Sequence, residues 1–379
     1  MLFKNGLVFL PEAGGFVKRD ILISKDKIIK VCENIEGEEA YDCSGKYIMP
    51  GLIEAHSHIG LFETGIGWEG SDGNEMTNPI TPALRAIDGI NPYDIAFKEA
   101  LEGGVTVACT GPGSANVIGG TFTIIKFKGN IVEDMIVKRV AAMKCAFGEN
   151  PKRVYGKSNK MPQTRMGIAY LLRKTLTEAE NYRAKKEKAM TEKDKVFPID
   201  LDMEALIPVL KREIPLKAHC HRADDICTII RIAEEFNVKV TLDHCTEGFL
   251  ICDYLKEKGY PAIVGPSFGA KGKIETNKKS FENAGILNRA GIKIAITTDH
   301  DVTPQQSLIM CAALAMKAGL SELEALKAVT INPAEILEID DKKGRLKDGL
   351  DADIVIWNKH PFDLQATVEA VFIEGDKVL

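Results

Sequence analysis

The chain has 379 residues, of which 45% are hydrophobic and 27% are charged, proportions typical of a soluble globular protein. This length is sufficient for one large barrel together with a small second domain. The formal net charge at pH 7 is -5, which argues against a nucleic-acid-binding surface because such a surface needs an excess of basic residues. We therefore expect a small-molecule substrate and no nucleic-acid partner.

The first residues do not have the pattern of a secretory signal. Residues 1–10 lack the charged start, the long apolar segment and the small-residue cleavage site of a signal peptide, and no uninterrupted apolar run is long enough to span a bilayer. The 9 cysteines are an odd number and are scattered singly, which favours reduced thiols over a disulfide framework. We expect a cytoplasmic location without a membrane partner, and the sequence leaves open whether the chain forms a homo-oligomer.

Both ends of the chain contain short strand patterns. Three apolar or alternating runs lie between residues 7 and 31. They are too few to bury a core by themselves, but residues 352–357 and 368–376 offer further strands from the other end of the chain. We therefore predict one small β-sandwich built from residues 1–48 together with residues 345–379.

The long middle segment, residues 49–344, alternates strand and helix patterns, which indicates a parallel sheet. We predict an α/β protein in which this segment forms a (β/α)8 TIM-like barrel. Asn91 and Pro92 are expected to begin a helix as its N-cap and first-turn proline. The motif Ser321-Glu322-Leu323-Glu324 is typical of a capping box at the start of a late helix.

The strand count is open between the second strand and the run that ends at His219. Residues 121–127 are either the third barrel strand or a hairpin inserted after the second strand, and residues 140–147 are the expected fourth strand. The sequence pattern of residues 165–190 predicts a long basic helix. Acidic residues interleave with its lysines, so we interpret the charges as a solvated face.

Histidines follow the apolar runs. His56 and His58 close the run of residues 49–58, and two residues with this spacing lie on one face of a strand, where two imidazoles can bind one metal ion. A hydrogen-bonded histidine pair is the alternative. All of the 7 histidines except His360 end β-branched or aliphatic runs, namely His56, His58, His219, His221, His244 and His300. Because the carboxyl ends of parallel barrel strands meet at one face, we expect these side chains to converge there.

Several of these motifs resemble those of a known group of enzymes. Residues 50–58, the strand ends at His219 and His244, and Asp299 after Thr298 resemble the metal-site signature of the amidohydrolase superfamily, in particular its imidazolonepropionase-like branch. The resemblance implies a divalent metal, with zinc expected, at one or two ions per chain. His56, His58 and Asp299 would hold one ion, and His219 and His244 would complete that site or hold a second.

The resemblance also implies a bridging group at the end of the fourth strand. A carboxylated lysine usually takes this place in the superfamily, and Lys144 is the best match. Glu149 is the rival, and the sequence does not decide between them.

The implied reaction is metal-dependent hydrolysis of a C–N bond in a cyclic amide, an N-acyl compound or a small peptide, by attack of metal-bound hydroxide. Asp299 would pass a proton from the water to the leaving nitrogen, and His244 would act beside it. His221 and His300 would orient the substrate or support the ligands. Arg222, like Arg165, is a candidate partner for a substrate carboxylate.

Two other functions stay open at this point. A deaminase of a heterocycle would use the same site, and a non-catalytic amidohydrolase-like scaffold would not need it. The complete set of candidate ligands argues against the scaffold. Residues 64–81, a long glycine-rich loop after the His58 strand, are either a lid or a solvated loop, and the glycine-rich residues 111–116 are either a ligand contact or a tight turn.

Overall fold

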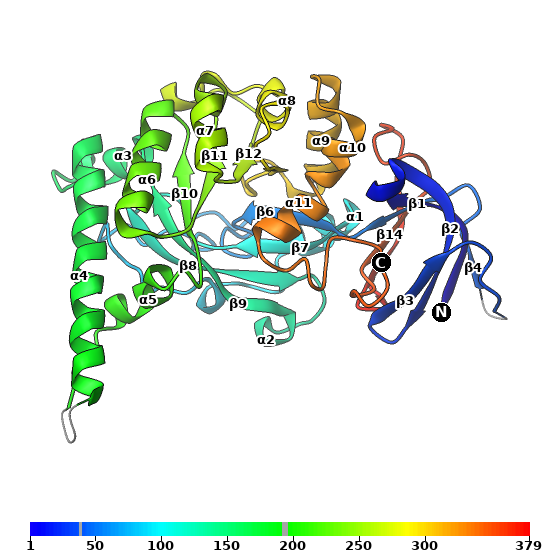
Figure 1. Cartoon of the computed structure of the whole chain (residues 1–379), viewed down its shortest axis with the longest axis horizontal. Coiled ribbons are helices and arrows are strands. Elements are labelled where there is room, and N and C mark those ends of the chain that lie inside the picture. The colour runs from blue at the N-terminus through cyan, green and yellow to red at the C-terminus, as the bar shows by residue number, and fades with distance from the viewer. Residues whose placement is uncertain (38–39, 192–195) are drawn as a thin grey trace.

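The computed structural model describes residues 1–37, 40–191 and 196–379. Two sheets organise the chain (Figure 1): one is surrounded by helices, and the other lies at one end of the molecule, where both chain termini are found. None of the described helices is both long enough and apolar enough to cross a membrane.

The terminal sheet joins strands from both ends of the chain. Its order is β16-β15-β14-β5-β1-β2-β3, with β4 paired to β1. These strands are β1 (Leu2–Leu10), β2 (Gly15–Ser24), β3 (Lys27–Cys32), β4 (Ala40–Asp42), β5 (Tyr47–Pro50), β14 (Ile354–Trp357), β15 (Val368–Ile373) and β16 (Asp376–Lys377). Phe3 from one end and Phe372 from the other pack in one buried core, with ring centroids 5.0 Å apart.

Strand β5 lies across residue 48, where the predicted N-terminal segment ends. β5 continues past residue 48 because Met49 and Pro50 pair with Val355 and Ile354 of β14. The chain therefore enters the barrel at β6. Whether the two parts are independent domains stays a prediction.

The second sheet has the order β13-β12-β11-β10-β9-β8-β7-β6 and closes almost completely, because β13 and β6 contact each other. Its strands are β6 (Leu52–Ser57), β7 (Val105–Thr110), β8 (Ile118–Lys126), β9 (Ile136–Ala146), β10 (Leu216–Cys220), β11 (Val240–His244), β12 (Ala262–Val264) and β13 (Ile294–Ile296). The predicted α/β fold with a TIM-like barrel is thus confirmed.

One strand of the barrel runs against the others. β8 pairs antiparallel with both β7 and β9, whereas the remaining neighbours pair in parallel. Residues 121–127 therefore satisfy both interpretations in part, because β8 is the third strand of the barrel sheet and also forms an antiparallel hairpin with the second strand. The short link between β7 and β8 leaves no room for the crossover helix that a parallel pair requires. β9, which carries Lys144, is the fourth strand of the sheet.

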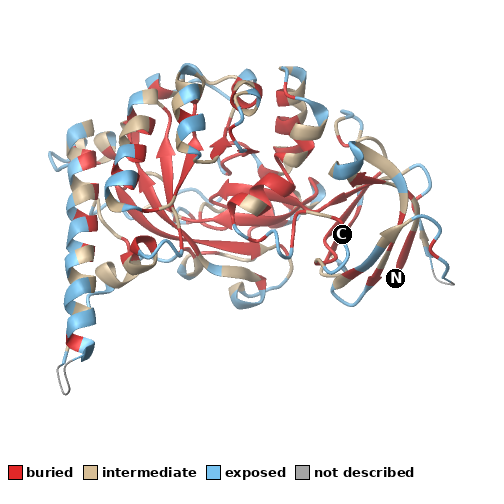
Figure 2. Cartoon of the chain, viewed as in Figure 1, coloured by how far each residue is buried: buried red, intermediate tan, exposed pale blue. Residues whose placement is uncertain are grey.

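Helices cover the outside of the barrel and turn their buried faces toward it (Figure 2). They are α1 (Ile95–Glu102), α2 (Val132–Met135), α3 (Glu149–Lys157), α4 (Arg165–Thr191), α5 (Leu201–Leu210), α6 (Ala223–Phe236), α7 (Cys252–Lys258), α8 (Glu282–Arg289), α9 (Leu308–Lys317), α10 (Glu322–Lys327) and α11 (Ile331–Ile336). The predicted capping box is confirmed in part, since the Ser321 hydroxyl accepts from the Glu324 backbone N–H.

The predicted start of the first helix is wrong. α1 begins at Ile95, and its N-cap is Asp94, whose carboxylate accepts from the Ala96 N–H. The Asn91 side chain instead accepts from the Tyr93 N–H. Asn91 therefore forms a local turn, which is the competing use of this residue type.

A buried cluster of charged side chains stabilises residues 343–353, where the chain passes from the barrel back to the terminal sheet. Lys343 is 2% exposed, and its Nζ lies 2.7 Å from Asp353 Oδ2 and 2.9 Å from Asp351 Oδ2. Burial alone would raise the pKa of Asp351, but Lys343 and Lys27 hold it below its ordinary value.

We expect Lys343→Met to lower the free energy of unfolding by about 3–5 kcal/mol, because it leaves two buried carboxylates with less compensation. Denaturant unfolding measures the loss. The lowered pKa of Asp351 means that the stabilisation is present above its unfolded-state pKa and is lost as pH falls, so the difference between variant and parent should shrink in acid. Lys342→Met, at the exposed neighbouring lysine, is the control. An equal effect of both changes would contradict this account.

Candidate metal centre

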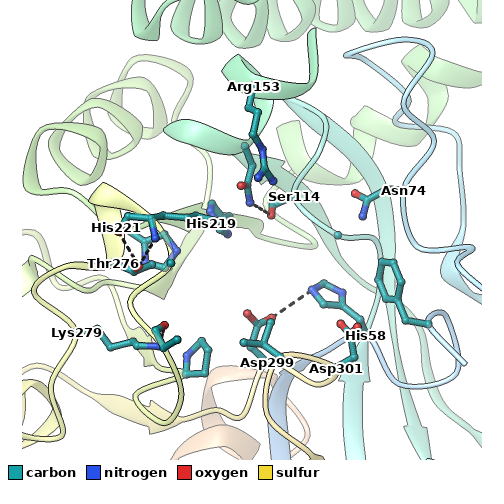
Figure 3. Close-up of a pocket in the computed structure, with 18 residues that line it drawn as sticks. His58, Asn74, Ser114, Arg153, His219, His221, Thr276, Lys279, Asp299 and Asp301 are labelled. Atoms are coloured by element: carbon teal, nitrogen blue, oxygen red, sulfur yellow. Dashed lines mark hydrogen bonds and ion pairs between the residues drawn. The ribbon is translucent and has the colours of Figure 1, made fainter. Parts of the chain in front are cut away.

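Two clusters of ligand-type side chains lie at the carboxyl ends of the barrel strands. The first is His56, His58 and Asp299, and the second is His219, His221 and His244; within each, the ligand atoms lie within 4.8 Å of one another. Asp299 Oδ1 lies 3.2 Å from His56 Nε2 and 3.3 Å from His58 Nε2. Figure 3 shows His58 facing Asp299, with His219 and His221 across the same cavity. The chain thus brings together five of the histidines that the sequence placed at strand ends, whereas His300 lies outside both clusters.

Backbone geometry at two strand ends directs the ligands inward. Asp243 and His244 are consecutive in β11, so regular alternation would point them to opposite faces. His244 has φ 71° and Cys245 has φ 47°, in the left-handed region that residues other than glycine rarely adopt. This turn lets Asp243 and His244 both contact the site. Asp299 has φ 54° in the same way.

The outer nitrogens of the imidazoles are held by fixed partners. His58 Nδ1 lies 2.6 Å from the Gly111 carbonyl oxygen, and His244 Nδ1 lies 2.7 Å from that of Gly265. A carbonyl oxygen only accepts, so both Nδ1 atoms donate, and in the neutral form of each ring the lone pair then lies on Nε2. His56 Nδ1 lies 2.9 Å from Asp243 Oδ2, an ion-pair contact that does not have the geometry of a hydrogen bond. Such outer partners orient histidine ligands in metal sites.

The inner nitrogens have no such partners. Nε2 of His56, His219 and His244 is buried without a hydrogen-bond partner among the described residues. Burial lowers the pKa of each of these three imidazoles. Burial would raise the pKa of Asp299, but the contacts with His244, His56 and His58 hold it well below its ordinary value. The lowered pKa values of the imidazoles and of Asp299 all favour deprotonated ligand atoms, which are the form that a divalent cation requires, so the residues fit a metal.

Comparison with known proteins agrees with this geometry. Residues 47–378 match the amidohydrolase family. The chain belongs to the amidohydrolase family. It is 30% identical to the amidohydrolase tasK of Hapsidospora irregularis over 94% of this chain and 39% of that protein. It is 28% identical to an adenine deaminase of Clostridium perfringens over 94% of this chain and 55% of that one, so it spans about half the length of these two relatives.

Further relatives cover whole chains. An imidazolonepropionase of Bacillus cytotoxicus is 21% identical over 96% of this chain and 87% of its own length. The solved structure of an amidohydrolase from Thermotoga maritima MSB8 superposes with a TM-score of 0.97 at 47% identity, covering 100% of this chain and 99% of that one. A prolidase complexed with N-methylphosphonate-L-proline has a TM-score of 0.62 at 18% identity over 100% of this chain and 98% of that one, which shows a shared fold.

The two candidate bridging residues of this amidohydrolase lie in different surroundings. Lys144 is fully buried, and its Nζ has no hydrogen-bond partner in the described chain. Burial lowers the pKa of this ammonium group. Glu149 is instead bound to the backbone, since its Oε1 accepts from the Glu275 N–H at 2.9 Å and Glu275 Oε2 accepts from the Glu149 N–H at 2.8 Å. Lys144 is therefore the candidate with an unused polar atom.

Sequence reasoning missed Glu275. This residue is 1% exposed, and its Oε1 has no hydrogen-bond partner among the described residues and lies 3.7 Å from His219 Nε2. It lies in a polar loop after β12, where no strand-end pattern indicates a functional position. Only the folding of that loop over the barrel brings Glu275 to the site.

The predicted substrate-binding residues separate into three places. His221 lies with His219 and His244, and its Nδ1 is 2.8 Å from Thr246 Oγ1. His300 lines a neighbouring cavity of about 390 Å³. Arg222 makes hydrogen bonds of 2.9 and 2.8 Å to Asp224 and does not line the main cavity.

The main cavity has a volume of about 480 Å³, and His58 and Asp299 of the first cluster and His219 and His221 of the second line it. Gly113 and Ser114 from the glycine-rich segment also line it, and the Gly111 carbonyl holds His58 from behind. Arg165, the other predicted carboxylate partner, is paired with Asp225 at 3.1 Å. The glycine-rich segment therefore borders the site, whereas Arg165 is occupied by an internal contact.

We expect His221→Asn to reduce bound metal from about two equivalents toward one, because His221 offers a ligand atom to the second cluster. Ligand and supporting residues typically change metal affinity about 10–100-fold. Elemental analysis of protein loaded with limiting zinc measures the stoichiometry. Arg222→Gln, at the adjacent residue, should bind as much metal as the parent. Unchanged metal content in His221→Asn would assign His221 to substrate contact instead.

Proposed function

We propose that this chain is a metal-dependent amidohydrolase that cleaves the C–N bond of a small molecule, namely a cyclic amide, an N-acyl compound or a small peptide. The observation that carries the proposal is the pair of buried clusters in which Nε2 of His56, His219 and His244 lacks a hydrogen-bond partner among the described residues, beside Asp299, whose pKa is held well below its ordinary value. One or two divalent cations, with zinc expected, would polarise the substrate carbonyl and lower the pKa of water from about 15.7 to about 7.

The residues of the chain account for the remaining steps. Asp299 Oδ1 faces His56 and His58 at the wall of the main cavity. Its ionised carboxylate is suited to accept a proton from the attacking water. It would then deliver that proton to the leaving nitrogen, which must be protonated to depart as an amine. Such acid–base assistance contributes about 10²–10⁴-fold to a rate.

A non-catalytic scaffold is the weaker interpretation. Each buried polar group without a partner costs about 1–3 kcal/mol, and the described part of this site holds several, including the Nε2 atoms of three histidines and the Nζ of Lys144. A protein that only assembles gains nothing from this cost. A deaminase is the stronger rival, because an adenine deaminase is among the relatives. The two reactions differ in product: a deaminase releases ammonia from a ring, and an amidohydrolase of acyl compounds releases an amine or opens a lactam.

We expect His56→Ala and Asp299→Asn to reduce turnover by at least about 10³-fold while the proteins remain folded. The assay screens N-acyl amino acids, dipeptides, lactams and aminated heterocycles with metal-loaded protein and reads amine or ammonia release. His360→Ala is the control, because His360 lies outside the site and contacts Glu322 on the surface. Full activity in both site variants would refute the proposed chemistry.

We propose Lys144, rather than Glu149, as the bridging residue. Its lowered pKa favours the neutral amine, which can attack carbon dioxide to give a carbamate with release of one proton. The negatively charged carbamate would then supply oxygen ligands to the metal centre, and the Nζ that would carry it is buried without a hydrogen-bond partner among the described residues.

We expect metal-loaded protein prepared with ¹³C-bicarbonate to show one carbamate signal by NMR that disappears in Lys144→Met. The same variant should bind less metal than the parent. Glu149→Gln should keep the carbamate signal and most of the metal. Loss of metal in Glu149→Gln together with an unlabelled Lys144 would assign the bridge to Glu149.

A further inference from the structure

Three basic side chains line the main cavity together with the candidate metal ligands. Arg153 comes from α3, and Lys273 and Lys279 come from the loop that follows β12. Figure 3 shows Arg153 reaching down from its helix toward Ser114, and Lys279 on the opposite side of the cavity. None of the three belongs to a pattern that the sequence singled out.

The basic groups are poorly neutralised by the protein. Arg153 has no ion pair or hydrogen bond to a side chain or carbonyl within residues 1–37, 40–191 and 196–379. Lys273 Nζ lies 3.9 Å from Glu275 Oε1, well beyond the 2.7–2.9 Å of a charge-assisted hydrogen bond. Within the part of the chain that the structure describes, Lys279 Nζ donates only to the Ala270 carbonyl, at 3.0 Å. The cavity therefore holds three cations that have no close carboxylate partner among the described residues, with Arg153 exposed to solvent and Lys273 and Lys279 half-buried.

These cations also repel one another. Burial lowers the pKa of Lys273, and the nearby Arg153 guanidinium lowers it further, against the attraction of Glu275 and Asp299. Burial lowers the pKa of Lys279 as well. Like charges drawn into one cavity are unfavourable, and an anion bound between Arg153 and Lys273 would relieve the repulsion.

The neighbouring cavity has the opposite charge. It is lined by Glu63, Glu99 and Asp301 and, among the described residues, by no lysine or arginine. His300, which is 5% exposed, borders it, and neither of its ring nitrogens has a hydrogen-bond partner among the described residues. Asp301 borders both cavities. The surroundings of the candidate metal centre are thus basic toward α3 and acidic toward the loop at residues 63–71.

We propose that Arg153 and Lys273 form an anion subsite that binds a carboxylate on the arm of the substrate extending toward α3. This assignment replaces Arg222 and Arg165, which are held by Asp224 and Asp225. Arg153 presents a planar pair of donors suited to bidentate binding of a carboxylate, and Lys273 adds a second charge. The substrate class of the proposed amidohydrolase is therefore an acidic amide. That the substrate is an amide rests on the proposed function, whereas that it carries an anionic group rests only on the cavity.

The test is equilibrium binding of simple carboxylates to the metal-loaded protein, measured by isothermal titration calorimetry. Acetate reports the affinity of a single carboxylate for the metal. Succinate, glutarate and adipate carry a second carboxylate at increasing distance. We expect at least one of these dicarboxylates to bind at least 10-fold more tightly than acetate. Arg153→Gln and Lys273→Gln should each remove most of this advantage, while acetate affinity stays within about twofold.

Lys157→Gln is the matched control, because Lys157 is an exposed cation on the same helix and does not line the cavity. This variant should keep the full advantage of the dicarboxylate. The proposal is overturned if no dicarboxylate exceeds acetate, or if the advantage survives both cavity variants. Dicarboxylate binding without hydrolysis of any amide would leave the subsite standing and reject the proposed reaction. Hydrolysis of an amide without a dicarboxylate advantage would support the proposed reaction and reject the anion subsite.

Discussion

The energetic requirement of buried imidazoles determines how this site is built. A ring nitrogen removed from water costs free energy unless it finds a partner. The Gly111 and Gly265 carbonyls satisfy Nδ1 of His58 and His244. They also fix the tautomer, which leaves Nε2 without a proton. Several such lone pairs directed at one another beside an ionised carboxylate remain unfavourable until a cation binds among them.

The fold supplies this arrangement through the ends of its strands. The imidazoles come from β6, β10 and β11, and the carbonyls that hold them come from the segments after β7 and β12. The left-handed backbone at His244 lets two consecutive residues of one strand contact the site. The antiparallel hairpin keeps β9 beside β10, and this position brings Lys144 to the same interior as His219. Each of these features depends on the closed barrel.

Much of the ligand set could be predicted from the sequence, because its signal is local. One-residue spacing at the end of an apolar run predicts a shared face for His56 and His58, and strand ends predict convergence. The sequence does not predict that β8 runs antiparallel to its neighbours, because the residue pattern of a strand is the same in either direction. The N-cap of α1 was placed wrongly because Asn91 and Asp94 are both good caps and only the packed helix decides between them.

Loop residues could not be predicted, for a different reason. Glu275, Arg153 and Lys273 lie near the candidate metal ligands only because α3 and the loop after β12 cover the barrel mouth. Nothing in their immediate sequence distinguishes them from the solvated charges of α4. Arg222 shows the converse, since it adjoins His221 in the sequence but is held by Asp224 away from the main cavity.

The most direct test of this account is a crystal of the zinc-loaded protein measured at the zinc absorption edge. The account predicts an anomalous peak enclosed by His56, His58 and Asp299, and a second among His219, His221 and His244. The absence of a peak at both clusters after loading, in protein that remains folded, would contradict it.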